Sequence, residues 1–129
     1  MEDRTDTRQR LGKKGEEIAC RLLESRGHRI IGRNFRCGHL EIDIISADRD
    51  GIHFVEVKTR RENIQAPPQD AVGAMKQRNI ARAAKKFLNT ATNIPPNCDE
   101  CFFDVVAVTV EDRKTKVEYF PQAYIPIYL

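Results

Sequence analysis

The sequence contains no run of 18 or more apolar residues, about the length that a membrane-spanning helix requires. Its first ten residues, MEDRTDTRQR, are too charged to contain the apolar segment of a signal peptide. No internal repeat, low-complexity stretch or linker divides the 129 residues. We therefore expect a single domain over residues 1–129, located in the cytoplasm and with no membrane partner.

Cysteines are few, and they do not form the paired motifs of a zinc module. Cys98 and Cys101 have the spacing of zinc ligands, but a structural zinc site usually needs two such pairs. Cys37 and His39 supply only a loose substitute for the second pair. Ordinary reduced thiols are the favoured interpretation. A zinc-stabilised module is the alternative, and the zinc content of the purified protein tests it.

The net charge of +3 is small, but the charges are unevenly distributed along the chain. Residues 37–57 have a net charge of −4, whereas residues 1–36 carry +4 and residues 58–86 carry +6. The basic segments could hold phosphates, and the acidic segment could hold a divalent cation. Solvated helix faces would give the same distribution.

Hydrophobic periodicity and turn residues predict an α/β domain with a central β-sheet flanked by helices. The expected helices cover about Thr7–Arg26, which Gly27 ends, and about Asp70–Leu88, which Asp70 caps. The expected strands are His28–Phe35, Leu40–Ser46, Ile52–Thr59, Phe102–Val110 and Lys116–Phe120. The last residues, Tyr124–Leu129, read as an edge segment because they contain a proline.

Two of these strands form a hairpin whose register can be predicted. The connection at 47–51 ends in Asp-Gly, a turn signal. If the turn centres between positions 49 and 50, residues whose numbers sum to 99 lie opposite each other. Asp43 then faces Glu56, and Glu41 faces Lys58, all on one side of the hairpin. Two carboxylates this close repel each other unless a cation or a proton lies between them.

Two interpretations of this charged face remain open. In the first, it is solvent-exposed and held by cross-strand salt bridges, while Ile42 and Ile44 cover the core on the other face. In the second, it binds a divalent metal ion, which needs only one or two protein carboxylates. The first helix offers a third carboxylate, because Glu16 borders its buried stripe and Glu17 lies on the solvated side.

Several stretches together resemble a known family: GKKGEEIACRLLESRGHRIIGRNFR, LEIDII, HFVEVKTRR and the later FDVVAV. They are similar to the YraN-like family of uncharacterised bacterial proteins. That family is placed with the PD-(D/E)XK nuclease-like proteins, which are relatives of archaeal Holliday-junction resolvases and restriction endonucleases. The resemblance covers nearly the whole chain. It implies a restriction-endonuclease-like fold with a central mixed β-sheet.

The resemblance also implies functional residues. The implied catalytic residues are Glu16, Asp43, Glu56, Lys58 and Gln77, and the implied metal contacts are Asp43, Glu56 and the carbonyl of Val57. In that scheme Glu16 is an accessory acid and Lys58 is the catalytic lysine. Lys76 and Gln77 fall where a polar residue of the following helix often faces the site. The expected cofactor is Mg²⁺ or Mn²⁺.

The expected activity is hydrolysis of phosphodiester bonds in DNA, with branched or flap DNA as candidate substrates. Basic residues beyond the E-x-K strand could hold phosphates: Arg60, Arg61, Lys76, Arg78, Arg82, Lys85 and Lys86. These residues could equally serve solubility. A non-catalytic nucleic-acid-binding or adaptor protein that keeps the fold is the alternative function. The segments Phe102–Val110 and Tyr124–Leu129 could form the face of a homodimer.

Overall fold

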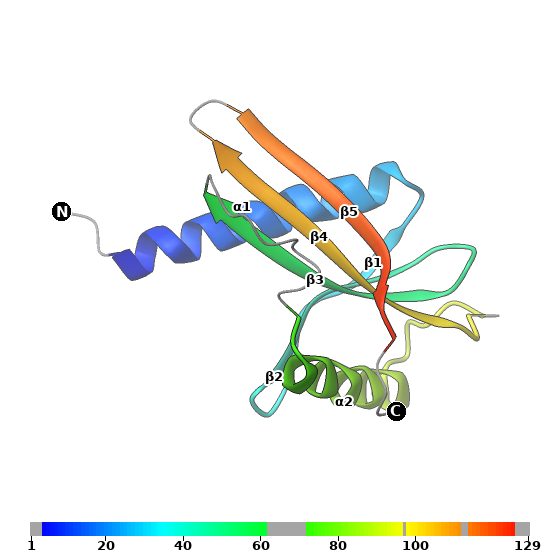
Figure 1. The fold of residues 1–129 in the computed structure, drawn as a ribbon. Coiled ribbons are helices and arrows are strands. Elements are labelled where there is room, and N and C mark those ends of the chain that lie inside the picture. The colour runs from blue at the N-terminus through cyan, green and yellow to red at the C-terminus, as the bar shows by residue number, and fades with distance from the viewer. Residues whose placement is uncertain (1–3, 62–71, 97, 112–113, 126–129) are drawn as a thin grey trace.

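The computed structural model describes residues 4–61, 72–96, 98–111 and 114–125, with side chains from residue 8 onward (Figure 1). Its elements are α1 (Arg4–Ser25), β1 (Arg29–Cys37), β2 (Leu40–Ala47), β3 (Ile52–Arg61), α2 (Ala74–Thr90), β4 (Cys101–Glu111) and β5 (Lys114–Tyr124). Every helix and strand expected from the sequence is therefore present. Neither helix, over these residues, is long and apolar enough to cross a membrane.

The five strands form one mixed sheet in the order β1-β2-β3-β4-β5. Strands β3 and β4 pair in parallel, and every other neighbouring pair is antiparallel. The chain passes through α2 between the two parallel strands, because such strands need a crossover connection. This is the α/β architecture with a mixed sheet that the restriction-endonuclease-like resemblance implies.

The predicted hairpin register is confirmed for the four pairs nearest the turn, whereas Asp43 with Glu56 and Glu41 with Lys58 are not backbone partners. Four residue pairs form the backbone ladder, from Ile44 with Val55 to Ala47 with Ile52, and the two residue numbers of each pair sum to 99. The backbone ladder stops at Ile44, so Asp43 and Glu56 lie just beyond its last pair. The two strands thus separate at the point where the sequence places its carboxylates.

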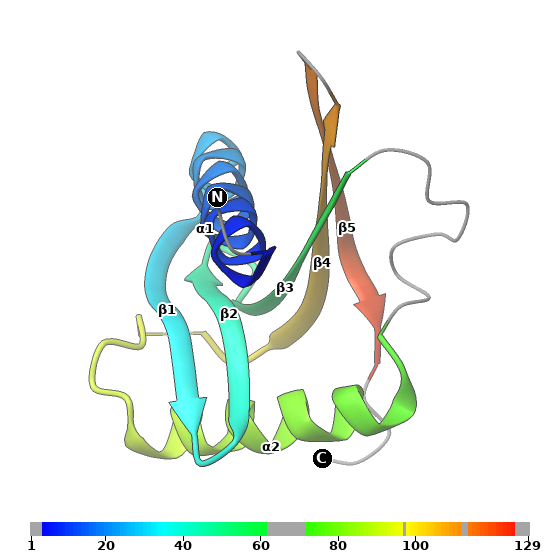
Figure 2. The same ribbon diagram turned by 90° about the vertical axis from the view of Figure 1, so that its left-hand side faces the viewer.

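The two helices pack on different sides of the sheet (Figures 1 and 2). Helix α1 contributes to one buried cluster, which includes Leu23, Val55 and Val106. Helix α2 contributes to the other, which includes Phe54, Phe87 and Phe103. Neighbouring residues of β3 alternate between the two clusters, as strand geometry requires. Both faces of β3 are therefore buried from Ile52 to Glu56, so the side of the hairpin that carries Glu56 is not solvent-facing there as the first interpretation expected.

Strand β2 changes face at Asp43. Ile42 packs into the α2 cluster and Ile44 into the α1 cluster, so the expectation that both cover the same core is wrong. Asn34, which lies opposite Asp43 on β1, has a φ of 50° in the left-handed region. Such a conformation departs from the extended backbone of a regular strand. The ends of β1 and β2 that meet at the β1–β2 turn lie beside α2, as Figure 2 shows.

The ends of two elements differ from the expectation. Helix α2 begins after Gly73, which makes no side-chain capping bond, and the predicted cap Asp70 lies outside the described residues. Strand β5 is longer than expected and includes Pro121. The proline is tolerated because β5 is an edge strand. Of the expected edge segment, Tyr124 ends β5, and residues 126–129 lie outside the described part of the chain.

Candidate active site

Asp43 and Glu56 meet where β2 and β3 separate. Asp43 Oδ2 accepts a 2.8 Å hydrogen bond from the backbone N–H of Val57, which keeps the carboxylate beside Glu56. Glu56 is buried, with a side chain only 6% exposed. Burial of the Asp43 carboxyl, with the negative charge of Glu56 beside it, raises its pKa to about 8 despite the bond from Val57. A second carboxylate beside the buried Glu56 favours a proton or a cation between the two.

Two lysines neutralise this acidic pair. Lys58 Nζ lies 3.6 Å from Glu56 Oε1 on the same strand, and Lys76 of α2 forms a close ion pair with the same oxygen. Burial lowers the pKa of Lys58, and the neighbouring ammonium of Lys76 lowers it further. Burial acts against Lys76 too, but its contacts with Glu56 outweigh this and raise its pKa. Lys58 is therefore the lysine of the pair that gives up its proton more readily.

Helix α1 brings a further acid to the same region. Gly15 is buried against Thr59 of β3, so closely that an added Cβ would overlap the Thr59 hydroxyl. This close approach places Glu16 beside Val57 and Lys58, and the three line a cavity of about 430 Å³. Glu17 is exposed and pairs with Arg33 at 3.2 Å. The prediction that Glu16 faces inward and Glu17 outward is confirmed.

Asn34 is a site residue that the sequence did not suggest. With its amide nitrogen turned toward them, Asn34 donates to Glu41 Oε1 and Glu16 Oε2 at 3.2 Å each. It thereby links β1, β2 and α1 at the edge of the carboxylate group. Glu41 itself is exposed and lies 3.8 Å from Arg36, and no contact with Lys58 is described. In the sequence, the signal for this residue would be an asparagine on β1 at the position opposite Asp43, because asparagine adopts a positive φ more readily than most residues.

The acidic residues face two cavities. The second cavity, of about 520 Å³, is lined by Asp43, Glu56, Lys76 and the exposed hairpin residues His39 and Glu41. Glu56 and Lys58 thus open on different cavities, joined by the 3.6 Å contact between them. The structure brings together Glu16, Asp43, Glu56, Val57, Lys58 and Lys76.

Gln77 has a local partner. Its Nε2 donates to the carbonyl of Val72 at 2.9 Å, and its backbone N–H bonds the Gly73 carbonyl. The side chain therefore holds the entry to α2. Its catalytic role stays a prediction.

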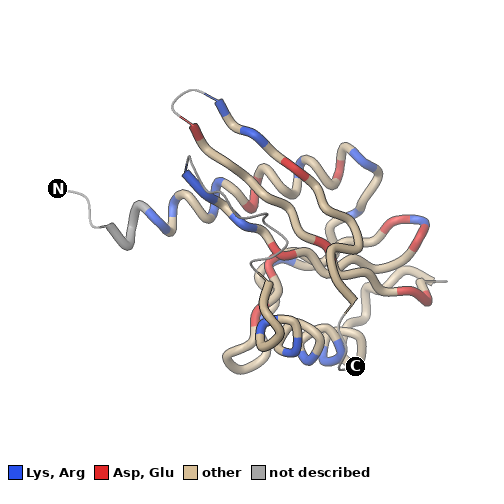
Figure 3. Tube along the Cα trace, in the orientation of Figure 1, with Lys and Arg blue, Asp and Glu red and all other residues tan. Residues whose placement is uncertain are grey.

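Of the basic residues predicted to contact nucleic acid, Lys76 pairs with Glu56, and the others lie along α2 and at the end of β3 (Figure 3). Four of them are exposed along α2: Arg78, Arg82, Lys85 and Lys86. Arg60 and Arg61 end β3, next to Lys58, and Arg61 is exposed. The positive charge thus forms a row along α2 and a second group at the end of β3, with the carboxylate site between them. Their contact with nucleic acid stays a prediction.

Cys98 and Cys101 are both free thiols, the first half-buried and the second exposed. Within the described residues, neither joins a group of three or more potential metal ligands. The choice between ordinary reduced thiols and a zinc module stays a prediction.

Comparison with known proteins identifies the family. The family described as "Uncharacterised protein family UPF0102" matches residues 15–108. A UPF0102 protein of Geobacter metallireducens is 42% identical over 115 residues, which cover 88% of this chain and 91% of the relative. One from Syntrophomonas wolfei is 39% identical over 114 residues, covering 88% and 96%. These matches confirm the YraN-like resemblance, and the chain belongs to family UPF0102.

Proposed function

We propose that this protein is a Mg²⁺- or Mn²⁺-dependent endonuclease that hydrolyses phosphodiester bonds in DNA, with branched or flap DNA as the first candidate substrates. The observation that carries the proposal is the convergence of Asp43, Glu56 and Lys58 at the point where β2 and β3 part. A salt-bridged surface would not need to bury Glu56 beside a second carboxylate.

The residues at this point fit a divalent ion. Asp43 and Glu56 supply two carboxylates on neighbouring strands, and the carbonyl of Val57 lies between Glu56 and Lys58 in sequence. An all-oxygen donor set of this kind suits Mg²⁺ or Mn²⁺. When bound, such an ion would neutralise negative charge on the scissile phosphate and make a water molecule more acidic.

The surrounding side chains have separate tasks in this mechanism. Lys58, whose pKa is lowered by burial, can hold the attacking water and stabilise charge on the phosphate through Nζ. Glu16 faces the same cavity from α1 and can orient Lys58 or a second water. Asn34 fixes Glu16 through its amide. Gly15 sets the distance between α1 and β3, because any side chain there would push the helix away.

The basic residues of α2 and of the end of β3 would hold DNA phosphates on both sides of the carboxylates. Among the described residues of this arrangement, no group of exposed aromatic side chains could stack unpaired bases. A duplex backbone at a branch point therefore suits the surface better than a single strand.

Action on DNA would place the protein in the cytoplasm. A homodimer would let two such sites act on both strands of a junction.

The ion pair between Lys76 and Glu56 favours a second candidate, the non-catalytic nucleic-acid-binding adaptor. A lysine on this carboxylate occupies the position that a metal ion would take, and it satisfies Glu56 without one. In the catalytic function, Lys76 would leave Glu56 when the metal binds and would turn toward a phosphate. Metal binding therefore separates the two functions.

The test combines calorimetric titration with Mn²⁺ and cleavage of labelled flap, junction, linear and single-stranded DNA. We expect Mn²⁺ binding that Asp43→Asn weakens, and cleavage that Glu56→Gln and Lys58→Met each abolish. Glu16→Gln should reduce cleavage, while the matched control Glu17→Gln, on the exposed side of α1, should not. Metal binding without cleavage of any substrate would favour the adaptor. Cleavage that survives Glu56→Gln would refute the site.

A further inference from the structure

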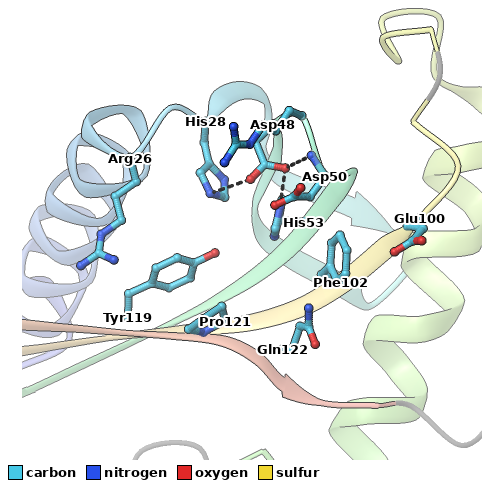
Figure 4. Close-up of a pocket in the computed structure, with 11 residues that line it drawn as sticks. Arg26, His28, Asp48, Asp50, His53, Glu100, Phe102, Tyr119, Pro121 and Gln122 are labelled. Atoms are coloured by element: carbon cyan, nitrogen blue, oxygen red, sulfur yellow. Dashed lines mark hydrogen bonds and ion pairs between the residues drawn. The ribbon is translucent and has the colours of Figure 1, made fainter.

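A second cluster of titratable side chains lies apart from the carboxylate site, where the α1–β1 and β2–β3 connections meet (Figure 4). His53 Nε2 lies 2.9 Å from Asp48 Oδ1, and His28 Nε2 lies 3.5 Å from Asp48 Oδ2. One ligand atom from each of the three residues lies within 4.8 Å of the others. His53 and Glu56 are three residues apart on β3, so they project from opposite faces of the sheet.

Each histidine is held through its other ring nitrogen. His53 Nδ1 lies 2.6 Å from Asp104 Oδ2, and His28 Nδ1 lies 2.8 Å from Ser46 Oγ. Asp104 is fully buried and also accepts bonds from the Tyr119 hydroxyl at 2.5 Å and the Gln122 backbone N–H at 2.9 Å. An ionised carboxylate can only accept, so His53 carries its proton on Nδ1.

The Nε2 atoms of both histidines face the carboxylate of Asp48. Asp48 is fixed as well, because its Oδ1 accepts from the backbone N–H groups of Asp50 and Gly51 at 2.9 and 3.2 Å. A histidine that donates Nδ1–H to a buried carboxylate while presenting Nε2 has the outer-sphere arrangement found at metal sites. The three groups are thus oriented before any ion arrives.

We propose that His28, Asp48 and His53 bind a divalent transition-metal ion, with zinc as the first expectation. Two imidazole nitrogens and one carboxylate oxygen are a zinc-type donor set. The oxygen donors of Asp43 and Glu56 would instead select Mg²⁺ or Mn²⁺. The chain would therefore carry two metal sites of different chemistry on opposite faces of one sheet.

The cluster borders a cavity of about 580 Å³. Arg26 and Tyr119 lie around the same opening (Figure 4). Arg49 also lines the cavity. Three protein ligands leave a coordination position for water on that side. Because the ligands come from two connections and one strand, the ion would tie together segments that are distant in sequence. Zinc should therefore raise the unfolding temperature of the protein.

The structure also admits a metal-free state, in which a doubly protonated His53 lies between Asp48 and Asp104. If the cluster serves only as this network of ion pairs, the protein has no zinc site. Direct measurement of zinc binding therefore decides between a metal site and an ion-pair network. The protein is stripped with a chelator and titrated with Zn²⁺ by calorimetry, and Co²⁺ is added separately to record its visible absorption. Both measurements use Cys98→Ser/Cys101→Ser protein, so that the thiol pair with zinc-like spacing does not contribute.

We expect one equivalent of zinc, and a Co²⁺ spectrum of a four-coordinate site without thiolate bands. Asp48→Asn and His53→Asn should each weaken zinc by more than the roughly 10- to 100-fold that follows removal of an outer-sphere partner. His39→Asn is the matched control, because His39 is the third histidine and is exposed on the β1–β2 turn. It should bind zinc as the parent does.

In Asp48→Asn, the side-chain carbonyl oxygen can still accept the hydrogen bonds from the backbone N–H groups of Asp50 and Gly51. This variant should therefore fold even if His53→Asn does not. Circular dichroism verifies the fold of each variant. Absence of zinc binding by the Cys98→Ser/Cys101→Ser protein would overturn the proposal. So would binding that Asp48→Asn leaves unchanged. Asp43→Asn should retain the zinc equivalent, which keeps this result independent of the carboxylate site.

Discussion

Asp43 Oδ2 accepts a 2.8 Å hydrogen bond from the backbone N–H of Val57, on the strand beyond the last backbone pair of the hairpin, Ile44 with Val55. A side chain thus continues the connection between β2 and β3 after the ladder has stopped. The bond holds Asp43 next to Glu56 although the two carboxylates repel each other. The repulsion is a cost to the folded state that a proton, a lysine or a metal ion can relieve.

Asp43→Asn should change how stability depends on pH. The raised pKa means that Asp43 holds its proton in the folded state between its ordinary pKa of 3.8 and about 8, where the unfolded chain has lost it. The folded state binds more protons in this window, so stability falls as pH rises, by at most about 1.4 kcal/mol per pH unit. The neutral amide removes this contribution.

The measurement is urea unfolding of metal-free wild type and Asp43→Asn at pH values from 5 to 8. The variant should gain stability over wild type as the pH rises. Titration of the histidines affects both proteins equally and cancels in the difference. Parallel curves for the two proteins would contradict the raised pKa.

Lys76→Gln should strengthen Mn²⁺ binding. Lys76 pairs with Glu56 and competes with a metal ion for the same carboxylate. Its side chain is 41% exposed, so the pair contributes only about 1 kcal/mol, equal to about a fivefold change in affinity. Calorimetric titration of the variant measures the change. The control is Lys85→Gln, because Lys85 is an exposed lysine further along α2. Equal or weaker binding by Lys76→Gln would show that the lysine does not compete.

Gly15→Ala should destabilise the protein although alanine favours a helix. The new methyl group would overlap the Thr59 side chain, and overpacking typically costs about 1–3 kcal/mol. Gly12→Ala, on the same helix with nothing within 4 Å of the added carbon, should stabilise by about 0.5–1 kcal/mol. Thermal and urea unfolding measure both variants. Thr59→Ala should partly restore Gly15→Ala, and a Gly15→Ala protein as stable as wild type would show that the helix can shift freely.

Lys85→Gln/Lys86→Gln should weaken DNA binding uniformly across sequences. Both lysines are exposed on α2, and each phosphate that the variant no longer neutralises should reduce the slope of log K against log salt by about 0.9. Fluorescence anisotropy over a range of salt concentrations measures this slope. Lys114→Gln/Lys116→Gln removes the same charge from exposed positions on β5 and should have a smaller effect. Equal effects would show that only net charge matters.

The local pattern of the sequence determined the elements and the hairpin register. Alternating apolar residues around an Asp-Gly turn allow few pairings, because a slip of one residue would reverse every side chain. The register of the four pairs nearest the turn therefore follows from the sequence alone. The bond from the Val57 N–H, which holds Asp43 beside Glu56 beyond the ladder, does not. Glu16 could be separated from Glu17 for a similar reason, since helical spacing fixes which of two neighbours borders the buried stripe.

Only the tertiary structure decided the contacts between elements that are distant in sequence. The pairing of β1 with β2 brings Asn34 opposite Asp43, and the packing of α2 brings Lys76 onto Glu56. Neither contact has a local pattern, because each depends on how separate elements dock. The cluster of His28, Asp48 and His53 is of the same kind in one respect. Asp48 and His53 are close in sequence across the β2–β3 turn, but only the pairing of β1 with β2 brings His28, which follows α1, next to them.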